Sequence, residues 1–116
     1  MNIIITGANG FIGSALVNHF TRFHNVLAIS EKQVSKTNFC LSISEFLNES
    51  NISRIKSFAP THFIHTAAIA HKKIKSNKVF LNKAKYINQI LPSILYSYSN
   101  KLGIKRFIFL SSIGVL

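Results

Sequence analysis

Three glycines near the start of the chain have the types and spacing needed to bind a phosphate group. They stand at Gly7, Gly10 and Gly13, between a short apolar run and a helical pattern. Glycine permits a tight turn at the first position, close backbone approach to a pyrophosphate at the second, and close helix packing at the third. The helix start then presents free N–H groups to the phosphates. The stretch predicts a dinucleotide-binding loop made of Gly7, Asn9, Gly10, Phe11, Ile12 and Gly13.

The spacing of these glycines is G-x-x-G-x-x-G, which differs from the G-x-G-x-x-G of ordinary dehydrogenases. A glycine-rich turn without a ligand is the alternative interpretation. The strand before the loop and the helix after it favour the binding loop.

A second candidate position follows the apolar run 26–29, where the chain reads Ser30-Glu31-Lys32. At the tip of this strand an acidic side chain binds the ribose 2′-hydroxyl of NAD, and a basic one suits the 2′-phosphate of NADP. Both types of side chain are present, so the cofactor can be NAD or NADP. A solvated loop charge is the alternative interpretation of Glu31.

The elements that must position these residues alternate along the chain. Strands are expected at 2–5, 26–29, 38–41, 61–68 and 107–112. The first helix has apolar residues at Ile12, Ala15, Leu16, Phe20 and Phe23. Two short helical pieces follow the third strand: Ser44 is expected to cap the first, with Leu47 buried, and the second begins near Ser53, with Ile55 and Phe58 on its apolar side. The alternation predicts an α/β fold, a doubly wound parallel sheet in one domain over 1–116.

A longer helix is expected over 79–102. Its apolar stripe runs through Ile87, Ile90, Leu91, Ile94, Leu95, Tyr98 and Leu102. Pro92 inside it predicts a kink near Asn88 or two helical segments, and Gly103 is a helix stop.

The candidate residues converge on one edge of this sheet. Ligands of parallel α/β sheets bind at the carboxyl ends of the strands. The segments 7–13, 30–32, 66–68 and 111–112 all fall at those ends.

Composition narrows the class of protein. The 116 residues are 47% hydrophobic, and Cys40 is the single cysteine, so neither an intramolecular disulfide nor a cysteine metal cluster is expected. The sequence contains neither a signal-peptide pattern nor an apolar run long enough to span a membrane. We expect a cytoplasmic protein.

The chain is strongly basic, with 14 Lys and Arg against three acidic residues and a net charge of +11. Such a charge suits a nucleic-acid-binding protein or a lysine-rich protein with an anionic nucleotide ligand. Base-reading motifs and stacking signatures are missing, which argues against nucleic acid. The basic cluster at 71–85 is interpreted as solvated surface, with a patch for an anionic substrate as the alternative.

Four segments in order resemble the N-terminal part of an extended short-chain dehydrogenase/reductase, in the NAD-dependent epimerase/dehydratase family. They are Thr6-Gly7-Ala8-Asn9-Gly10-Phe11-Ile12-Gly13, His65-Thr66-Ala67-Ala68, Asn88, and Gly103-Ile104-Lys105-Arg106-Phe107-Ile108-Phe109-Leu110-Ser111-Ser112. Segments 67–71 and 110–113 look most like UDP-sugar 4-epimerase-like enzymes of polysaccharide synthesis.

The resemblance implies a Rossmann-type sheet truncated after about five strands, with NAD or NADP taking a hydride from a sugar carbon. By position, Ser112 resembles the hydroxyl residue that hydrogen-bonds the substrate oxygen. Cofactor contacts are implied for Ser30, Glu31, Ser42, Ile43, Thr66, Ala67, Ala68, Asn88 and Ser111. The helix over 79–102 resembles the family's dimerisation helix.

The chain also departs from the family pattern. Ser30 and Ser42 stand where many members have an aspartate, and none of the three tyrosines begins a Tyr-x-x-x-Lys pair. We expect that pair and the nucleotide-sugar domain beyond Leu116, so that this is a cofactor-binding portion, inactive alone and prone to self-association. A non-catalytic dinucleotide-binding module and a basic nucleic-acid-associated protein are the alternatives.

Overall fold

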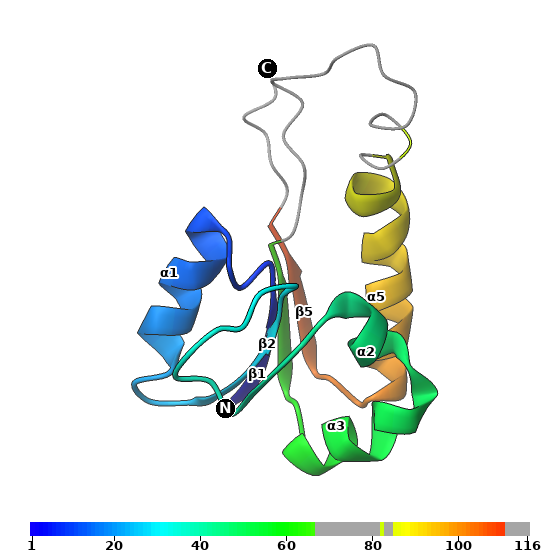
Figure 1. The fold of residues 1–116 in the computed structure, drawn as a ribbon. Helices are drawn as coiled ribbons and strands as arrows, with labels where there is room; N and C mark the ends of the chain where they lie inside the picture. Colours follow the sequence, from blue (N-terminus) through cyan, green and yellow to red (C-terminus); the bar gives the residue numbers. More distant parts are fainter. Residues whose placement is uncertain (67–81, 83–84, 111–116) are drawn as a thin grey trace.

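The computed structural model describes residues 1–66, 82 and 85–110, which form a parallel sheet in the order β3-β2-β1-β4-β5 (Figure 1). Its strands are β1 (Asn2–Thr6), β2 (Asn25–Ile29), β3 (Phe39–Leu41), β4 (His62–His65) and β5 (Arg106–Phe109). The helices are α1 (Phe11–Phe20), α2 (Ile43–Leu47), α3 (Ile52–Phe58) and α5 (Leu91–Lys101), with a 3-10 turn η1 (Glu49–Asn51) and a π turn η3 (Tyr86–Ile90). The predicted doubly wound α/β fold is confirmed.

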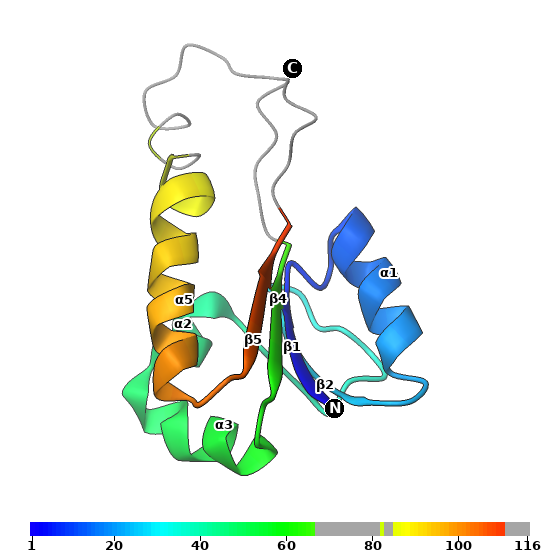
Figure 2. The ribbon, with the colours of Figure 1, turned by 180° about the vertical axis from the view of Figure 1, so that it is seen from behind.

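The helices cover both faces of the sheet. Helix α1 lies on one face, and α2, α3 and α5 lie on the other (Figures 1 and 2). Successive strand side chains alternate between the two layers, so β1 sends Ile3 and Ile5 toward α1 and Ile4 toward the other helices. A strand that is buried on both faces explains the uninterrupted apolar run at the start of the chain.

The strand order reverses between β1 and β4. From β1 the chain first builds outward to β2 and β3, and then returns to place β4 on the other side of β1. The register sets Ile5 of β1 opposite Ala28 of β2 and Ile64 of β4. The carboxyl ends of β1 and β4 therefore flank the crevice in which doubly wound sheets bind ligands.

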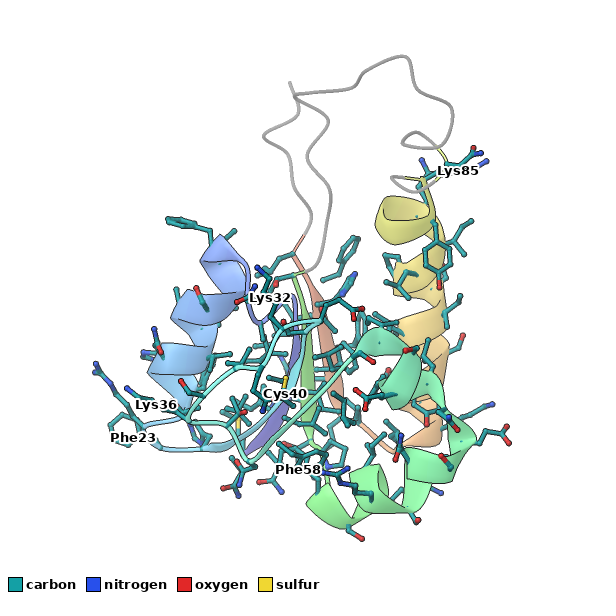
Figure 3. All side chains as sticks on the ribbon, viewed as in Figure 1. Phe23, Lys32, Lys36, Cys40, Phe58 and Lys85 are labelled. Carbon is teal, nitrogen blue, oxygen red and sulfur yellow. The ribbon has the colours of Figure 1, made fainter. Side chains whose placement is uncertain are left out.

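Helix α1 is shorter than its apolar pattern predicted. It ends at Phe20, and the Thr21 hydroxyl and N–H both donate to the carbonyl of Val17. Phe23 was expected on the buried stripe, but it is 79% exposed and points away from the sheet (Figure 3). The buried residues of α1 are Gly13 and Val17, whereas Ile12 and Ala15, also expected on the stripe, are exposed.

The short helix after β3 begins differently from the prediction. Ser42, and not Ser44, is the N-cap of α2, since its hydroxyl accepts the backbone N–H of Glu45 at 3.1 Å. Phe46 is fully buried on this helix, while Leu47 is only partly buried. Helix α3 buries Ile55 and packs Phe58 against the core, as expected.

The long helix changes its winding just before Pro92. Residues Tyr86–Ile90 form the π turn, and the N–H of Leu91 donates to the carbonyl of Tyr86, five residues earlier. The predicted irregularity is thus a widened turn that leads into α5. Leu91 and Leu95 are buried, but Ile90 and Ile94 of the expected stripe are exposed. Gly103 has a φ of +72°, which fits the predicted helix stop.

Two strands are shorter than expected. Strand β4 ends at His65, so that Thr66 follows it, and β5 ends at Phe109. The expected strand residues Ala67, Ala68, Ser111 and Ser112 lie outside the described residues. None of the helices in the described ranges is both long and apolar enough to cross a membrane.

Candidate functional site

The loop between β1 and α1 is shaped by its first glycine. Gly7 has a φ of +64°, a conformation that L side chains rarely adopt. The N–H of Gly10 donates to the Gly7 carbonyl at 2.9 Å and closes the turn. The first glycine of the motif therefore has the predicted role.

Gly13 has the predicted packing role, but its contact is with the loop. A β-carbon at this position would overlap the carbonyl oxygen of Gly7 and lie 2.6 Å from its carbon. The same β-carbon would lie 3.0 Å from Oγ1 of Thr66, which follows β4. The helix, the glycine loop and the end of β4 thus meet at one point where only hydrogen fits.

The start of α1 is open to an anion. Gly10 is its N-cap, and within the described ranges no side chain caps the helix. No acidic residue lies in that turn, and Phe11 is 95% exposed beside it. Free N–H groups and the positive end of the helix dipole fit a phosphate at this place.

A pocket of about 370 Å³ joins this loop to the tip of β2. It is lined by Gly7, Asn9 and Gly10 from the loop, Ile29 through Lys32 from the end of β2, and Ile43 and Leu91 from the starts of α2 and α5. Six of these residues come from the predicted cofactor set, from three separate segments of the chain: Gly7, Asn9, Gly10, Ser30, Glu31 and Ile43. The carboxyl edge of the sheet brings them together.

The tip of β2 presents both charges that could decide the choice between NAD and NADP. Glu31 and Lys32 are exposed and line the pocket, and Figure 3 shows Lys32 near the carboxyl edge of the sheet. Ser30 is held by the backbone, since its N–H donates to the Leu41 carbonyl at 2.9 Å. Its hydroxyl accepts the N–H of Lys32 at 3.2 Å. That hydroxyl therefore shapes the turn that carries the two charges.

Ser42 and Ile43 were both expected to contact the cofactor, and only Ile43 lines the pocket. The Ser42 hydroxyl caps α2, and the carboxylate of Glu45 accepts the Ser42 N–H at 2.8 Å, which completes a capping box. These bonds to the backbone and the hydroxyl of Ser42 lower the pKa of Glu45. Ile43 lines the pocket, and Ser42 does not. The structure therefore gives the Ser42 hydroxyl a structural role.

Of the other predicted residues, Thr66 lies at the site. Its Oγ1 donates to the Thr6 carbonyl at 2.6 Å and its N–H donates to the Thr6 hydroxyl at 3.0 Å. Asn88 lies in the π turn η3. The remaining four, Ala67, Ala68, Ser111 and Ser112, lie outside the described residues.

Sequence reasoning did not single out Thr6 and His65, which lie behind the glycine loop and do not line the pocket. Both are fully buried at the carboxyl ends of their strands, and Thr6 Oγ1 lies 2.6 Å from His65 Nδ1. Burial lowers the pKa of His65 to about 4, so its imidazole is neutral near pH 7. The sequence did contain a signal for this pair, because each is a polar residue at the end of an apolar strand, at the edge of the sheet where ligands bind.

A second groove, of about 490 Å³, lies between α5 and β5. Its lining comes from Gln89, Pro92, Ser93, Tyr96, Ser97, Phe107 and Phe109. None of these residues belongs to the predicted cofactor set. Of these two hollows in the described part of the chain, the glycine-loop pocket has the predicted phosphate loop and the predicted ribose-side residues in its lining, which makes it the candidate dinucleotide site.

Comparison with known proteins agrees with this geometry. The model of the NAD dependent epimerase/dehydratase family matches residues 3–116. No curated protein sequence matches the chain at a significant level.

Several solved structures have the same fold. MoeE5 in complex with UDP-glucose and NAD has a TM-score of 0.74 and 20% identity over 97% of this chain. A UDP-glucose-4-epimerase from Stenotrophomonas maltophila with bound NAD has a TM-score of 0.71, 22% identity and 99% coverage. A UDP-N-acetylglucosamine 4-epimerase from Methanobrevibacter ruminantium M1 has a TM-score of 0.69, 24% identity and 98% coverage. The chain spans 37%, 38% and 38% of the lengths of these three proteins, respectively.

Proposed function

Because this chain belongs to the NAD dependent epimerase/dehydratase family, we propose that it forms the cofactor-binding portion of a nucleotide-sugar epimerase, dehydratase or reductase. The main evidence is the arrangement of the glycine loop. Gly13 packs against Gly7 and Thr66. Beside this contact, the start of α1 has no side-chain cap among the described residues, and the pocket extends to the tip of β2. Glycines packed to this degree leave the loop backbone free to face a pyrophosphate.

The residues fit NAD or NADP in extended form. The N–H groups at the start of α1 hold the pyrophosphate, since nothing else in the described residues caps them. Glu31 or Lys32 takes the adenosine ribose, and Ile43 packs against the adenine in the apolar part of the pocket. Thr66, Ala67, Ala68, Asn88 and Ser111 belong to the nicotinamide side in this proposal.

When bound, the nicotinamide accepts a hydride from a sugar carbon and can return it. Ser112 is the proposed hydrogen-bond donor to the substrate oxygen. The 116 residues contain no Tyr-x-x-x-Lys pair to act as base, so we propose that this chain binds cofactor without turnover. A nucleotide sugar, such as the UDP-glucose bound by MoeE5, becomes a substrate only where a C-terminal part completes the site.

We also propose that the chain forms a homodimer through the 79–102 helix and that it is cytoplasmic. The +11 charge makes nucleic acid the competitor to be tested beside the dinucleotides.

Calorimetric titration of the chain with NAD, NADP and a DNA duplex at two salt concentrations tests the function. We expect saturable heat with at least one dinucleotide. Glu31→Gln should weaken NAD if that carboxylate holds the ribose, and Lys32→Gln should weaken NADP if that ammonium holds the 2′-phosphate. Tight DNA binding that falls steeply with salt, without dinucleotide heat, would overturn the proposal.

A further inference from the structure

A buried pair of polar side chains lies behind the glycine loop. Thr6 closes β1, His65 closes β4, and the two residues are register partners. Both are fully buried, and Oγ1 of Thr6 lies 2.6 Å from Nδ1 of His65. Neither residue lines the candidate pocket, so they act on the site only through their neighbours.

The hydrogen bonds around the Thr6 hydroxyl determine which imidazole nitrogen carries the proton. The hydroxyl accepts the backbone N–H of Thr66 at 3.0 Å. Its own hydrogen can be donated to Nδ1 of His65 when that nitrogen is unprotonated. With the proton on Nδ1 instead, both the hydroxyl hydrogen and Nε2 would lack a partner among the described residues, whereas the first arrangement leaves only Nε2 unpaired. The network therefore favours a neutral imidazole with its proton on Nε2.

The surroundings keep the imidazole in this form. The Phe109 ring of β5 stacks on it at 5.3 Å between centroids. The strands beside His65 supply Thr6 and Phe109, neither of which carries a charge, and burial alone accounts for the lowered pKa of His65. Among the described residues, Nε2 has no hydrogen-bond partner.

The pair is connected to the glycine loop through Thr66. The Thr6 hydroxyl holds the Thr66 N–H, and Oγ1 of Thr66 in turn donates to the carbonyl of Thr6. Oγ1 of Thr66 lies against Gly13, at the place where a β-carbon would come within 3.0 Å of it. A change at His65 therefore reaches α1 and the loop through two hydrogen bonds and one close contact.

We propose that His65 is a positioning residue of the dinucleotide site: its unprotonated Nδ1 orients the Thr6 hydroxyl, which fixes Thr66 against Gly13 and so sets the shape of the phosphate loop. The inference rests on the proposed function, because the site it positions is the dinucleotide site.

Two matched pairs of variants of the full chain test the proposal. Thr6→Ser keeps the hydroxyl, and Thr6→Val keeps the shape without it. His65→Asn keeps an acceptor near the place of Nδ1, and His65→Leu removes it. We expect Thr6→Val and His65→Leu to weaken NAD binding by about tenfold or more, and Thr6→Ser and His65→Asn to stay within about threefold of the unsubstituted chain.

Two readouts do not depend on the cofactor. Nitrogen NMR of the imidazole should show His65 neutral with its proton on Nε2, and hydrogen exchange of the Thr66 amide should accelerate in Thr6→Val but not in Thr6→Ser. His19→Asn, at an exposed position near the end of α1, is the control and should change neither readout.

The outcomes separate the two proposals. A proton on Nδ1, unchanged Thr66 exchange in Thr6→Val, or equal loss of NAD affinity in Thr6→Ser and Thr6→Val would overturn the positioning role. A folded chain that shows the expected NMR signals and exchange but binds neither dinucleotide would overturn the proposed function instead.

Discussion

The hydrogen of Gly13 lies against the carbonyl group of Gly7, at a place where a β-carbon would be only 2.6 Å from the carbonyl carbon. Five residues lie between the two glycines, and the contact closes that segment into a loop between β1 and α1. The two glycines have different roles, because Gly7 adopts the left-handed backbone conformation of the turn and Gly13 leaves room for the Gly7 carbonyl beside the helix.

Gly13→Ala should destabilise the fold, because its methyl group meets backbone and not a flexible side chain. We expect a loss of about 2–4 kcal/mol in the free energy of unfolding, measured by urea denaturation. Gly103→Ala is the matched comparison: its φ is +72° but nothing lies within 4 Å. That variant should cost about 1 kcal/mol, and equal losses at the two positions would contradict the packing argument.

Gly10→Val should affect binding more than folding. Gly10 has a φ of −80°, which any residue adopts, and a β-carbon there meets only the Gly7 oxygen, at 3.2 Å. We expect stability to fall by about 1 kcal/mol or less while calorimetry shows NAD binding abolished. Asn18→Ala, exposed on the same helix, should bind normally. Undiminished NAD binding by Gly10→Val would show that the backbone at Gly10 does not approach the cofactor.

Acid should destabilise the chain through His65. Burial lowers the pKa of this residue from 6.5 to about 4. At a pH between these two pKa values the unfolded chain binds a proton that the folded chain does not. The contribution of neutral His65 to the free energy of unfolding is therefore fully present above pH 6.5 and is lost as the pH falls toward 4. We expect the free energy of unfolding to drop by about 3 kcal/mol between about pH 7 and pH 4. The decline should be smaller in His65→Asn; an equal decline there would assign it to other groups.

Ser42→Ala should cost stability and leave the cofactor site intact. Its hydroxyl accepts the Glu45 N–H at the start of α2 and does not line the pocket. Loss of an N-cap costs about 1 kcal/mol, which thermal unfolding can detect. Ser53→Ala, exposed on α3, provides the comparison and should change stability little. A marked loss of NAD affinity in Ser42→Ala would restore the contact implied by the family resemblance.

The isolated chain should self-associate through β5. In the described part of the chain this strand pairs only with β4, and Ile108 and Phe109 on it are exposed. An unpaired apolar edge favours pairing with another chain. Sedimentation should show association that rises with concentration and weakens in Ile108→Lys, since a lysine at an edge opposes pairing. A monomer with a sharp, concentration-independent melting transition would contradict this expectation.

Local patterns were sufficient for the sheet and for most of the pocket. Apolar runs and the alternation of strands with helices identify all five strands, and parallel pairing places their carboxyl ends at one edge. The glycine spacing likewise locates the loop, because both of its unusual backbone features, the positive φ at Gly7 and the contact at Gly13, require glycine.

The interpretation of the local patterns did not include three features of the structure. The bond between Thr6 and His65 joins residues 59 positions apart, and no local spacing encodes it. The stripe expected on α1 included Phe23, yet α1 ends at Phe20, and the turn after it, in which the Phe23 N–H donates to the Phe20 carbonyl, leaves Phe23 exposed. Ser42, expected at the cofactor by resemblance, also forms a capping box with Glu45, for which the sequence had the spacing.

The π turn before Pro92 has a consequence for insertions and deletions in this helix. A π turn holds one residue more than an α turn, and the N–H of Leu91 reaches back to Tyr86 across it. Because the π turn fits its extra residue into a single turn, deleting one residue within Tyr86–Ile90 would return that turn to α-helical bonding and keep the helix continuous. The segment is therefore a point at which the helix can lose one residue, while Leu91 and Leu95 keep α5 packed on the sheet.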